Sequence, residues 1–350
     1  MSRVKVFIIA EAGSNWKVGR PTQDLKMAKT LIEAAKKAGA DAVKFQTYRA
    51  ETVYVPNAGS SDYLSKNGIR RSITQIFRDL AMPYEMIPKL AAHAKKHKIE
   101  FMSSAFSEAD FKAVDPYVIR HKIASYEISH PRLLSLAAKS GKPLILSTGA
   151  CAYEDIDWAV DYFKKNGGRS ISLMQCTAKY PAPLSALNLR VIPEMSRRYR
   201  VPVGLSDHSM DPVIGPVTAV TLGATLIEKH FTMDRKLQGP DHAFALTPQE
   251  LKEMVFSVRS CQEALGDGKK RVLSVERELK AYAQRALQAT RDISKGEVLR
   301  EGFNIGILRP GKQSQGAHPK YLNSINGKRA SRSIPVGRGV RLTDVGDERF

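Results

Sequence analysis

The sequence predicts a (β/α)8 barrel followed by a small, mostly β domain, and three observations support this α/β assignment. Over the first 265 or so of the 350 residues, short apolar runs that end in polar residues alternate with amphipathic helical segments. Eight such runs occur, which is the number of strands in a closed barrel of this kind. From about residue 289 the chain changes to short strand-like runs with frequent glycine and proline.

Each of the eight apolar runs has the length and composition of a buried parallel strand. The clearest helix between them covers residues 22–38, where apolar residues recur at helical spacing and Gly39 follows as a stop. Residues 55–80 interrupt the alternation of strands and helices. They form a Gly-, Ser- and Asn-rich insertion, which we expect to be a loop at the barrel mouth. The expected strands span 6–12, 42–48, 99–106, 121–127, 143–150, 171–177, 203–208 and 225–231. Further helices are expected at 84–98, 131–140, 154–165 and 248–265.

These changes of pattern predict three parts of the chain. Residues 1–265 form the barrel, residues 266–288 form a linker with some helix, and residues 289–350 form the small domain. A domain of that size has little core of its own, so we expect it to dock on another surface.

Composition and charge exclude several classes of protein. Hydrophobic residues make up 43% and charged residues 26%, and 55 basic against 35 acidic residues give a net charge of +20. The basic residues are spread along the chain in short runs, so we expect no nucleic-acid partner and attribute the positive potential to steering small anions. No apolar run is long enough to span a membrane, and three scattered cysteines form no CxxC pair. We expect a cytoplasmic protein with reduced thiols and no membrane partner.

Polar side chains gather where the expected strands end. In this fold the carboxyl ends of the strands carry the chemistry, and residues two apart share one face of a strand. Charged side chains at a barrel mouth are costly without partners, so the lysines and glutamates indicate a binding site. For the serine and threonine hydroxyls, the alternative is that they cap the helices that follow. The strand-end residues are Glu11, Lys44, Gln46, Ser103, Ser104, Lys122, Ser125, Glu127, Ser147, Thr148, Gln175, Thr177, Ser206, His208, Glu228 and His230.

Two histidines among them predict a metal site. His208 and His230 end the seventh and eighth expected strands, which one strand–helix–strand unit places side by side. Two imidazoles give a divalent ion two nitrogen ligands and leave positions for water and substrate, as in a Lewis-acid catalyst. Strand-end lysines and hydroxyls suit a phosphate or carboxylate, and two glutamates could move protons. The residues alone therefore predict a metal-assisted enzyme acting on an anionic, phosphorylated small molecule.

Ordered motifs along essentially the whole chain are similar to a known family. They include IIAEAGSN (8–15), AGADAVKFQTY (38–48), KIASYE (122–127), GLSDHS (204–209) and GPDH (239–242). The chain resembles the sialic acid synthases, which condense phosphoenolpyruvate with an N-acylated amino sugar such as N-acetylmannosamine and release phosphate. The C-terminal segment resembles the antifreeze-like SAF domain, a β-clip fold.

The resemblance implies a role for individual residues. His208 and His230 would bind manganese, with magnesium or cobalt as alternatives. The phosphoenolpyruvate residues would be Lys44, Ser104, Lys122, Ser125, Ser147 and Ser206. The catalytic residues would be Glu11, Glu127, Lys122 and Tyr180. The sugar would meet Glu11, Gln46, Asn67, Asp241 and Arg309. Arg309 would come from the partner subunit, which implies a domain-swapped homodimer.

Two departures from the family pattern concern the sugar. Trp16 stands where the family often has histidine, and Ala178 stands where it often has Asn or Ser, so two sugar contacts are expected to change. The GPDH motif favours a neuraminate- or legionaminate-type acceptor over a pseudaminate-type one. The alternatives are another phosphoenolpyruvate-dependent sugar-acid synthase or a non-catalytic sugar-binding homologue. The retained histidines, lysines and glutamates favour an enzyme.

Overall fold

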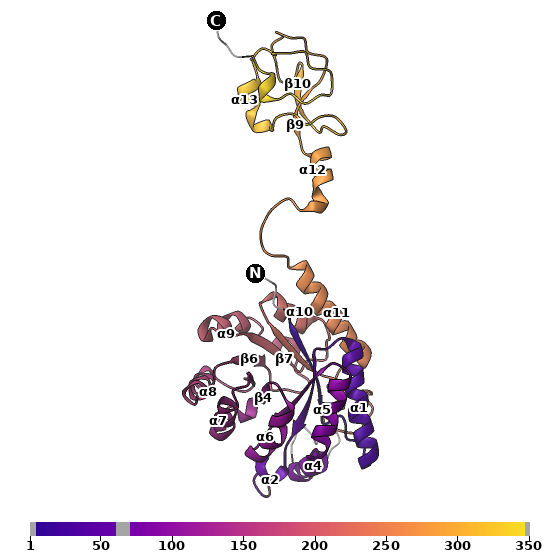
Figure 1. Cartoon of the computed structure of the whole chain (residues 1–350), viewed down its shortest axis with the longest axis vertical. Helices are drawn as coiled ribbons and strands as arrows, with labels where there is room; N and C mark the ends of the chain where they lie inside the picture. Colours follow the sequence, from indigo (N-terminus) through magenta and orange to yellow (C-terminus); the bar gives the residue numbers. More distant parts are fainter. Residues whose placement is uncertain (1–4, 61–70, 347–350) are drawn as a thin grey trace. The chain divides into compact units, whose positions relative to one another are not determined.

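The protein divides into two compact units, each described here by itself. The computed structural model describes residues 5–60 and 71–346, and the units are Met1–Gly266 and Asp267–Phe350. Figure 1 shows the first unit in indigo through pink to the orange of α11 (Pro248–Ala264), and the C-terminal unit in orange to yellow.

The first unit is a closed barrel of eight parallel strands, as the sequence predicts. Each strand pairs with the next along the chain, and β8 returns to pair with β1. The strands are β1 Phe7–Gly13, β2 Ala42–Thr47, β3 Glu100–Ala105, β4 His121–Ile123, β5 Leu144–Ser147, β6 Ile171–Cys176, β7 Val203–Asp207 and β8 Leu226–His230.

Helices surround this barrel, and their ends follow local sequence signals. The first ends at Gly39, whose φ of 92° is left-handed and whose N–H is donated to Ala35 O and Lys36 O. The last begins with a capping box between Thr247 and Glu250. The helices are α1 Pro21–Ala38, α2 Ala50–Val53, α4 Ile73–Leu80, α5 Met86–Lys96, α6 Glu108–Val114, α7 Pro131–Lys139, α8 Tyr153–Lys165, α9 Val191–Tyr199, α10 Ile214–Thr221 and α11 Pro248–Ala264.

Two segments differ from the sequence expectation. Strand β4 ends at Ile123, and residues expected to continue it form the 3-10 helix Ser125–Glu127, in which Glu127 N–H bonds Ala124 O. The insertion at 55–80 is not all loop, because its described part contains α4, which Ser72 caps by accepting the Gln75 N–H. Both differences place additional side chains around the barrel mouth.

The barrel interior has an apolar layer with a polar layer directly above it. Side chains two residues apart on a strand share one face. Two positions after each apolar residue, the next side chain therefore also points into the barrel, but one layer nearer the mouth. The apolar layer consists of Ile9, Ala42, Met102, Ile145, Met174 and Leu226. Two residues further along the same strands stand Glu11, Lys44, Ser104, Ser147, Cys176 and Glu228. The apolar layer closes the barrel beneath the polar one.

The C-terminal unit is a small, mostly irregular β structure. It contains α12 Arg277–Ala283, α13 Leu322–Ile325 and an antiparallel pair, β9 Ala286–Ala289 with β10 Ile305–Leu308. Strand β9 begins inside the segment that the sequence predicts to be a linker. The composition of AYAQRALQA favours a helix, whereas in the structure the four β9 residues are buried in a strand. The core of the unit includes Leu287, Leu299, Ile305, Ile325 and Val340.

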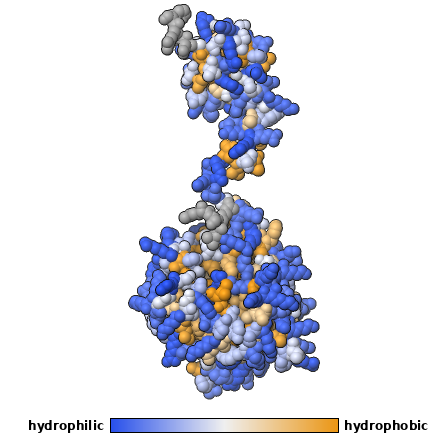
Figure 2. Space-filling model, in the orientation of Figure 1, coloured by the Kyte–Doolittle hydropathy of each residue, from blue (hydrophilic) through white to orange (hydrophobic). Residues whose placement is uncertain are grey.

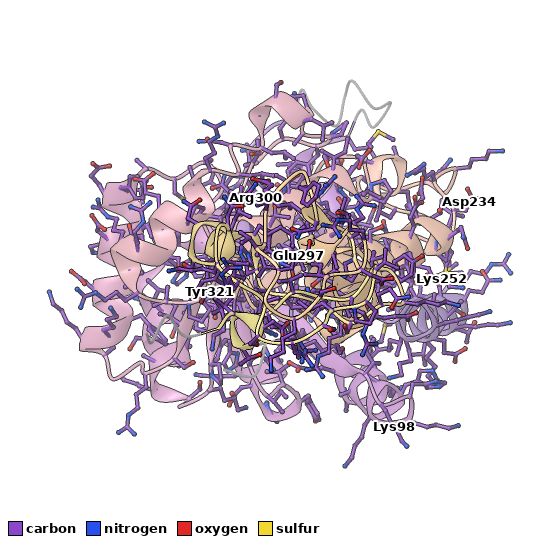
Figure 3. All side chains as sticks on the ribbon, turned by 90° about the horizontal axis from the view of Figure 1, so that it is seen from above. Lys98, Asp234, Lys252, Glu297, Arg300 and Tyr321 are labelled. Carbon is purple, nitrogen blue, oxygen red and sulfur yellow. The ribbon has the colours of Figure 1, made fainter. Side chains whose placement is uncertain are left out.

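A buried asparagine fixes one loop of this unit. Asn304 donates to Glu297 Oε1 at 2.9 Å and accepts the Arg300 N–H at 2.7 Å, and the labels in Figure 3 mark Glu297 and Arg300. The connection that precedes β10 is therefore held by side-chain hydrogen bonds as well as by apolar packing.

The basic side chains of the barrel are dispersed over its surface. Lys98 and Lys252, for example, are both exposed, one in the turn after α5 and the other on α11 (Figure 3). Within the described residues, no helix is long and apolar enough to cross a membrane.

Candidate active site at the barrel mouth

A buried ionic network occupies the polar layer of the barrel. Lys44 Nζ lies 2.6 Å from Glu11 Oε2 and 3.5 Å from Glu228 Oε1, and Lys122 Nζ lies 3.5 Å from the same Glu228 oxygen. The four side chains are at most 5% exposed. Strands β1, β2, β4 and β8 supply them, so two lysines share one carboxylate across the barrel.

Three hydroxyls complete this network. Lys44 donates to Ser104 Oγ at 3.2 Å and Lys122 donates to Ser147 Oγ at 2.8 Å. Ser206 Oγ donates to Glu228 Oε1 at 3.3 Å. Five of the six residues expected to bind phosphoenolpyruvate thus lie in one cluster. The sixth, Ser125, is buried nearby and its Oγ accepts the Gly149 N–H at 2.8 Å.

The charges in the network perturb one another. Burial raises the pKa of Glu11 to about 7, although Lys44 opposes that shift. Burial also acts to raise the pKa of Glu228, but Lys122 and Lys44 together outweigh it and lower that pKa. For Lys122, burial lowers the pKa, whereas for Lys44 the two carboxylates overcome burial and raise it. The buried lysines hold Glu228 as a carboxylate and present positive charge at the mouth.

The two expected metal ligands are neighbours at the carboxyl ends of β7 and β8. The ring centroids of His208 and His230 are 5.5 Å apart. His208 Nδ1 lies 2.9 Å from Thr177 O, which assigns its proton to Nδ1 and leaves the Nε2 lone pair free for a ligand. Burial and the nearby positive charges lower the pKa of His230 well below its usual value, so that ring is neutral.

These histidines fit a divalent metal. His230 Nδ1 is buried and has no hydrogen-bond partner among the described residues, and it lies 3.8 Å from Asp241 Oδ2. An unpartnered buried nitrogen beside a second imidazole and a carboxylate is the donor set that manganese and similar ions accept.

A cavity of about 650 Å³ opens beside His230, one layer nearer the mouth than the ionic network. Its polar lining includes the expected sugar residues Gln46 and Asp241, the expected catalytic residues Glu127 and Tyr180, and the expected metal ligand His230. Gln46 donates to Glu11 Oε1 at 2.9 Å, and the ring of Tyr180 stacks near that of His208 with centroids 4.2 Å apart. The apolar lining consists of Tyr48, Val53, Tyr54, Ile73, Ile76, Phe77, Leu80, Phe106, Ala124, Tyr126 and Ala178.

Glu127 belongs to this cavity but not to the ionic network. Its Oε2 is buried and has no hydrogen-bond partner within the described part of the chain. Burial raises the pKa of Glu127 to about 7, with Lys122 opposing the shift. A second hollow of about 680 Å³ also contains Tyr126 and Glu127, but it is lined by His130 and lacks Tyr180, His230 and Asp241, so we assign the site to the first cavity.

Three expected sugar-side residues lie elsewhere or outside the described structure. Asn67 falls outside the described residues. Arg309 is exposed and follows β10 in the C-terminal unit. Trp16, expected to alter a sugar contact, is only 1% exposed and belongs to the barrel's hydrophobic core. Ala178, by contrast, does line the cavity.

The sequence places Glu228 among the strand-end residues but gives it no role, although Glu228 is the carboxylate that joins the two lysines. The signal was present in its spacing, because Glu228 stands two residues before His230 on one strand and therefore shares its face. Among residues of a buried strand, a charge on the same face as a metal ligand is itself a candidate for the site.

Replacing Glu228 by alanine should leave two buried lysines without their shared carboxylate. We expect the free energy of unfolding to fall by roughly 3–5 kcal/mol. Inorganic phosphate should restore part of that loss, because an anion can take the place of the carboxylate. Urea unfolding with and without phosphate measures both effects, and Glu253→Ala, which removes an exposed carboxylate on α11, is the control. A loss below about 1 kcal/mol would contradict the network.

Replacing Glu127 by glutamine should stabilise the protein in a pH-dependent way. The pKa of Glu127 is raised from 4.5 to about 7, so folding at neutral pH requires burying a carboxylate that is unfavourable there. That cost is absent near pH 4.5 and complete above pH 7, where it amounts to at most about 3 kcal/mol. Glu127→Gln should therefore be more stable than the wild type at pH 8 and similar to it at pH 5. Equal differences at both pH values would refute the assignment.

Comparison with known proteins gives the family. The NeuB family model matches residues 31–270, and the SAF domain model matches residues 284–346. The chain is 39% identical to the spore coat polysaccharide biosynthesis protein SpsE of Bacillus subtilis, over 97% of this chain and 93% of that one. It is 38% identical to the N,N'-diacetyllegionaminic acid synthase of Legionella pneumophila, over 96% and 93% of the two chains.

Solved structures agree with this result. The crystal structure of Bacillus subtilis SpsE superposes with a TM-score of 0.64 at 37% identity, covering 99% of this chain and 96% of that one. The N-acetylneuraminic acid synthetase of Leptospira borgpetersenii, solved with citrate, gives a TM-score of 0.69 at 33% identity over 79% and 91%. The chain, with its eight-stranded barrel and C-terminal SAF domain, belongs to the NeuB family of nonulosonic acid synthases.

Proposed function

We propose that the protein condenses phosphoenolpyruvate with the open-chain form of an N-acylated amino sugar and releases phosphate. The observation that carries this proposal is the buried Lys44–Glu228–Lys122 network beside the His208–His230 pair at the barrel mouth. One part suits a small dianionic substrate and the other suits a Lewis acid, and the adjacent cavity has room for a sugar.

Phosphoenolpyruvate would bind over the lysines. Its carboxylate and phosphate are both anionic, and Lys44 and Lys122 with their serine partners offer ammonium and hydroxyl donors in a buried setting. Burial lowers the pKa of Lys122, and the negative charge of a bound anion would act to raise that pKa. Substrate binding would therefore favour the charged ammonium form of Lys122. As phosphate leaves, the same lysines stabilise its growing negative charge.

His208 and His230 would hold a divalent cation, with manganese as our first choice and magnesium or cobalt as alternatives. When bound, such an ion supplies a Lewis acid that polarises the sugar's aldehyde oxygen. The Nδ1–H of His208, fixed by Thr177 O, sets that ring's orientation toward the ion.

The chain's carboxyl groups would handle the protons of the reaction. Carbon 3 of phosphoenolpyruvate bonds to the aldehyde carbon, and the aldehyde oxygen gains a proton. Water then adds to carbon 2 and loses a proton, which leaves a hydroxyl there. The bond from carbon 2 to the phosphate oxygen breaks as this hydroxyl becomes the carbonyl of the product, and its proton passes to the departing phosphate. Glu127, whose pKa of about 7 lets it hold or accept a proton at neutral pH, can donate the first proton and receive the second. Glu11, bonded to Gln46 and Lys44, would orient the sugar.

The lining of the cavity favours an acceptor without a phosphate. Lys179 is the only basic side chain other than His230 that the described residues place in it, and nine aromatic or large aliphatic residues form an apolar wall: Tyr48, Val53, Tyr54, Ile73, Ile76, Phe77, Leu80, Phe106 and Tyr126. Such a wall suits the methyl group of a diacetamido-trideoxy sugar better than a hydroxymethyl group or a phosphate ester. Legionaminic and pseudaminic acid synthases are 38% and 37% identical to this chain, so identity alone does not choose between those two acceptors.

We further propose a domain-swapped homodimer, in the cytoplasm, in which Arg309 reaches the barrel of the partner. Two features support the swap. Arg309 is exposed within its own unit, and α12 with the preceding turn presents exposed apolar side chains that need a cover. Those side chains are Val275, Leu279 and Tyr282, at 83%, 67% and 52% exposure, and Figure 2 shows orange atoms in that region.

Replacing His208 by alanine tests the metal and the reaction together. Purified protein should release phosphate from phosphoenolpyruvate with manganese and a diacetamido-trideoxy sugar, and much less with N-acetylmannosamine or its phosphate ester. We expect His208→Ala to lose at least about 100-fold in rate while remaining folded, because a metal ligand is removed at a solvent-reachable mouth. His318→Ala, which removes an exposed histidine, should be normal. Near-normal turnover by folded His208→Ala would refute the metal site, and no release with any sugar would favour a non-catalytic homologue.

Mixing two inactive variants tests the swap. Arg309→Ala subunits keep an intact barrel and His208→Ala subunits keep an intact arginine. If Arg309 acts in trans, half of a random mixture is mixed dimers with one complete site in two, so about a quarter of wild-type activity should return. Arg338→Ala, an exposed arginine of the same unit, is the control for Arg309→Ala. Mixed dimers that form without regaining activity would show that Arg309 does not act across the interface.

A further inference from the structure

We infer that the outer layer of the barrel contains a second metal site, formed by Glu33, His93 and His97, which takes one divalent transition-metal ion such as zinc, nickel or copper. Glu33 lies on α1, His93 lies on α5 and His97 directly follows α5. None of the three residues takes part in the proposed reaction.

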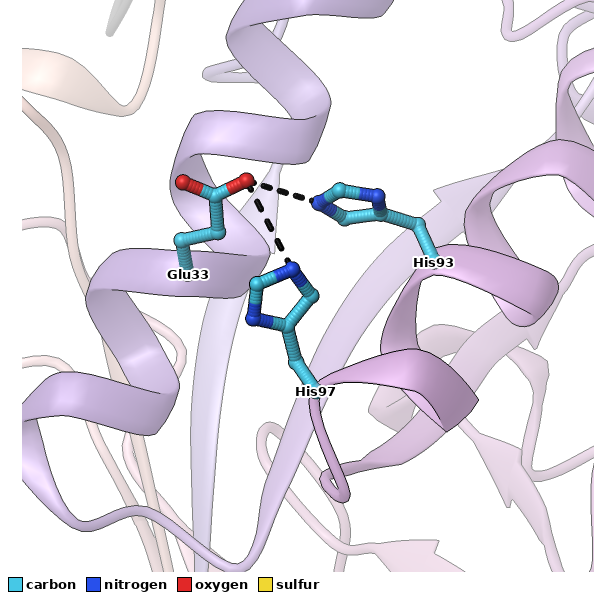
Figure 4. Close-up of side chains that lie close together, drawn as sticks. All are labelled: Glu33, His93 and His97. Carbon is cyan, nitrogen blue, oxygen red and sulfur yellow. Dashed lines mark hydrogen bonds and ion pairs between the residues drawn. The ribbon is translucent and has the colours of Figure 1, made fainter.

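The three side chains already converge on one point. His93 Nε2 lies 2.9 Å and His97 Nε2 lies 3.7 Å from the same oxygen of Glu33, Oε1 (Figure 4). One ligand atom from each residue can be chosen so that all lie within 4.8 Å of one another. The imidazole rings are tilted by 42° with centroids 4.5 Å apart, which brings both ring edges to the carboxylate.

The local backbone explains this convergence. His93 and His97 are four residues apart, and the His97 N–H bonds His93 O at 3.1 Å, so their side chains leave one face of the same turn. Helix α1 packs beside α5 and supplies the carboxylate across the groove between the helices. Glu33 is 51% exposed and the histidines are 15% and 31% exposed, so an ion can reach the site from solvent.

Two imidazole nitrogens and one carboxylate oxygen are ligands that favour borderline transition metals over magnesium or calcium. On binding, each Nε2 would present its lone pair to the ion, with the ring proton on Nδ1, and water would fill the remaining position. Lys36 and Lys95 are exposed on the same two helices and oppose a cation. We therefore expect weaker binding than at a buried structural zinc site.

The position of the cluster separates it from catalysis. Helix α5 ends at Lys96, shortly before β3 begins at Glu100, so His97 lies at the amino-terminal end of the strands. The proposed active site lies at the opposite, carboxyl-terminal end. An ion here would join α1 to α5 and stabilise the barrel without contacting substrate.

Zinc titration of the full chain tests this site. All proteins carry His208→Ala, so that the mouth contributes equally to every measurement and the result does not depend on the proposed function. Chelator-treated protein is titrated by calorimetry, and its thermal midpoint is followed with added zinc. The test variant is His93→Gln/His97→Gln, and the matched control is His318→Gln, which changes an exposed histidine of the C-terminal unit.

We expect the test variant to bind one equivalent of zinc fewer than the control and to lose the zinc-dependent rise in the thermal midpoint. Glu33→Gln, which keeps both imidazoles, should weaken zinc binding by at least about tenfold without abolishing it. Zinc stoichiometry and thermal midpoint that are the same in the test variant and the control would overturn the inference. In a background with intact His208, the double variant should synthesise product at the wild-type rate.

Discussion

The structure depends on the carboxylate of Glu228, which two lysines share inside the barrel. A buried ammonium group is costly unless a charge or an anion compensates it, and here one carboxylate must serve both Lys44 and Lys122, with Glu11 paired only to Lys44. The charges balance only when both glutamates are ionised, and burial raises the pKa of Glu11 to about 7, so at neutral pH the network retains a deficit of negative charge. A dianion the size of phosphoenolpyruvate is the ligand that this deficit favours.

The layering of the barrel explains how such a network can be buried at all. Six apolar side chains close the barrel below it, and the cavity and the histidines lie above it. Each layer is separated from the next by two residues along a strand, so the same backbone that packs the core also positions the charges. The low polarity of the layer below strengthens every interaction in the layer above.

Much of this architecture could be predicted from the sequence. Eight apolar runs with polar ends predict the barrel, and ten or so ordered motifs predict the family, both of which are confirmed. The pairing of His208 with His230 followed from one strand–helix–strand unit. By contrast, the early end of β4 at Ile123 could not be read from HKIASYE, because this run contains no Gly or Pro to mark the point where the strand gives way to a 3-10 turn.

Other features required three-dimensional contacts. The role of Glu228 depends on strands β2 and β4, which lie far from it in sequence, although its spacing from His230 was a usable signal. Trp16 was expected to change a contact at the sugar site, yet its side chain is buried in the hydrophobic core of the barrel. Glu33 is 60 residues from His93, so only the packing of α1 on α5 reveals their cluster.

Calorimetric titration of phosphoenolpyruvate without sugar tests the central claim most directly. The wild type should bind one equivalent per barrel. Lys122→Met keeps the length of the side chain but removes its charge, and it should weaken binding by at least about tenfold. Lys252→Met, which changes an exposed lysine on α11, should bind as the wild type does. Equal affinity for all three folded proteins would contradict the account, because the buried lysines would then have no part in recognising the anion.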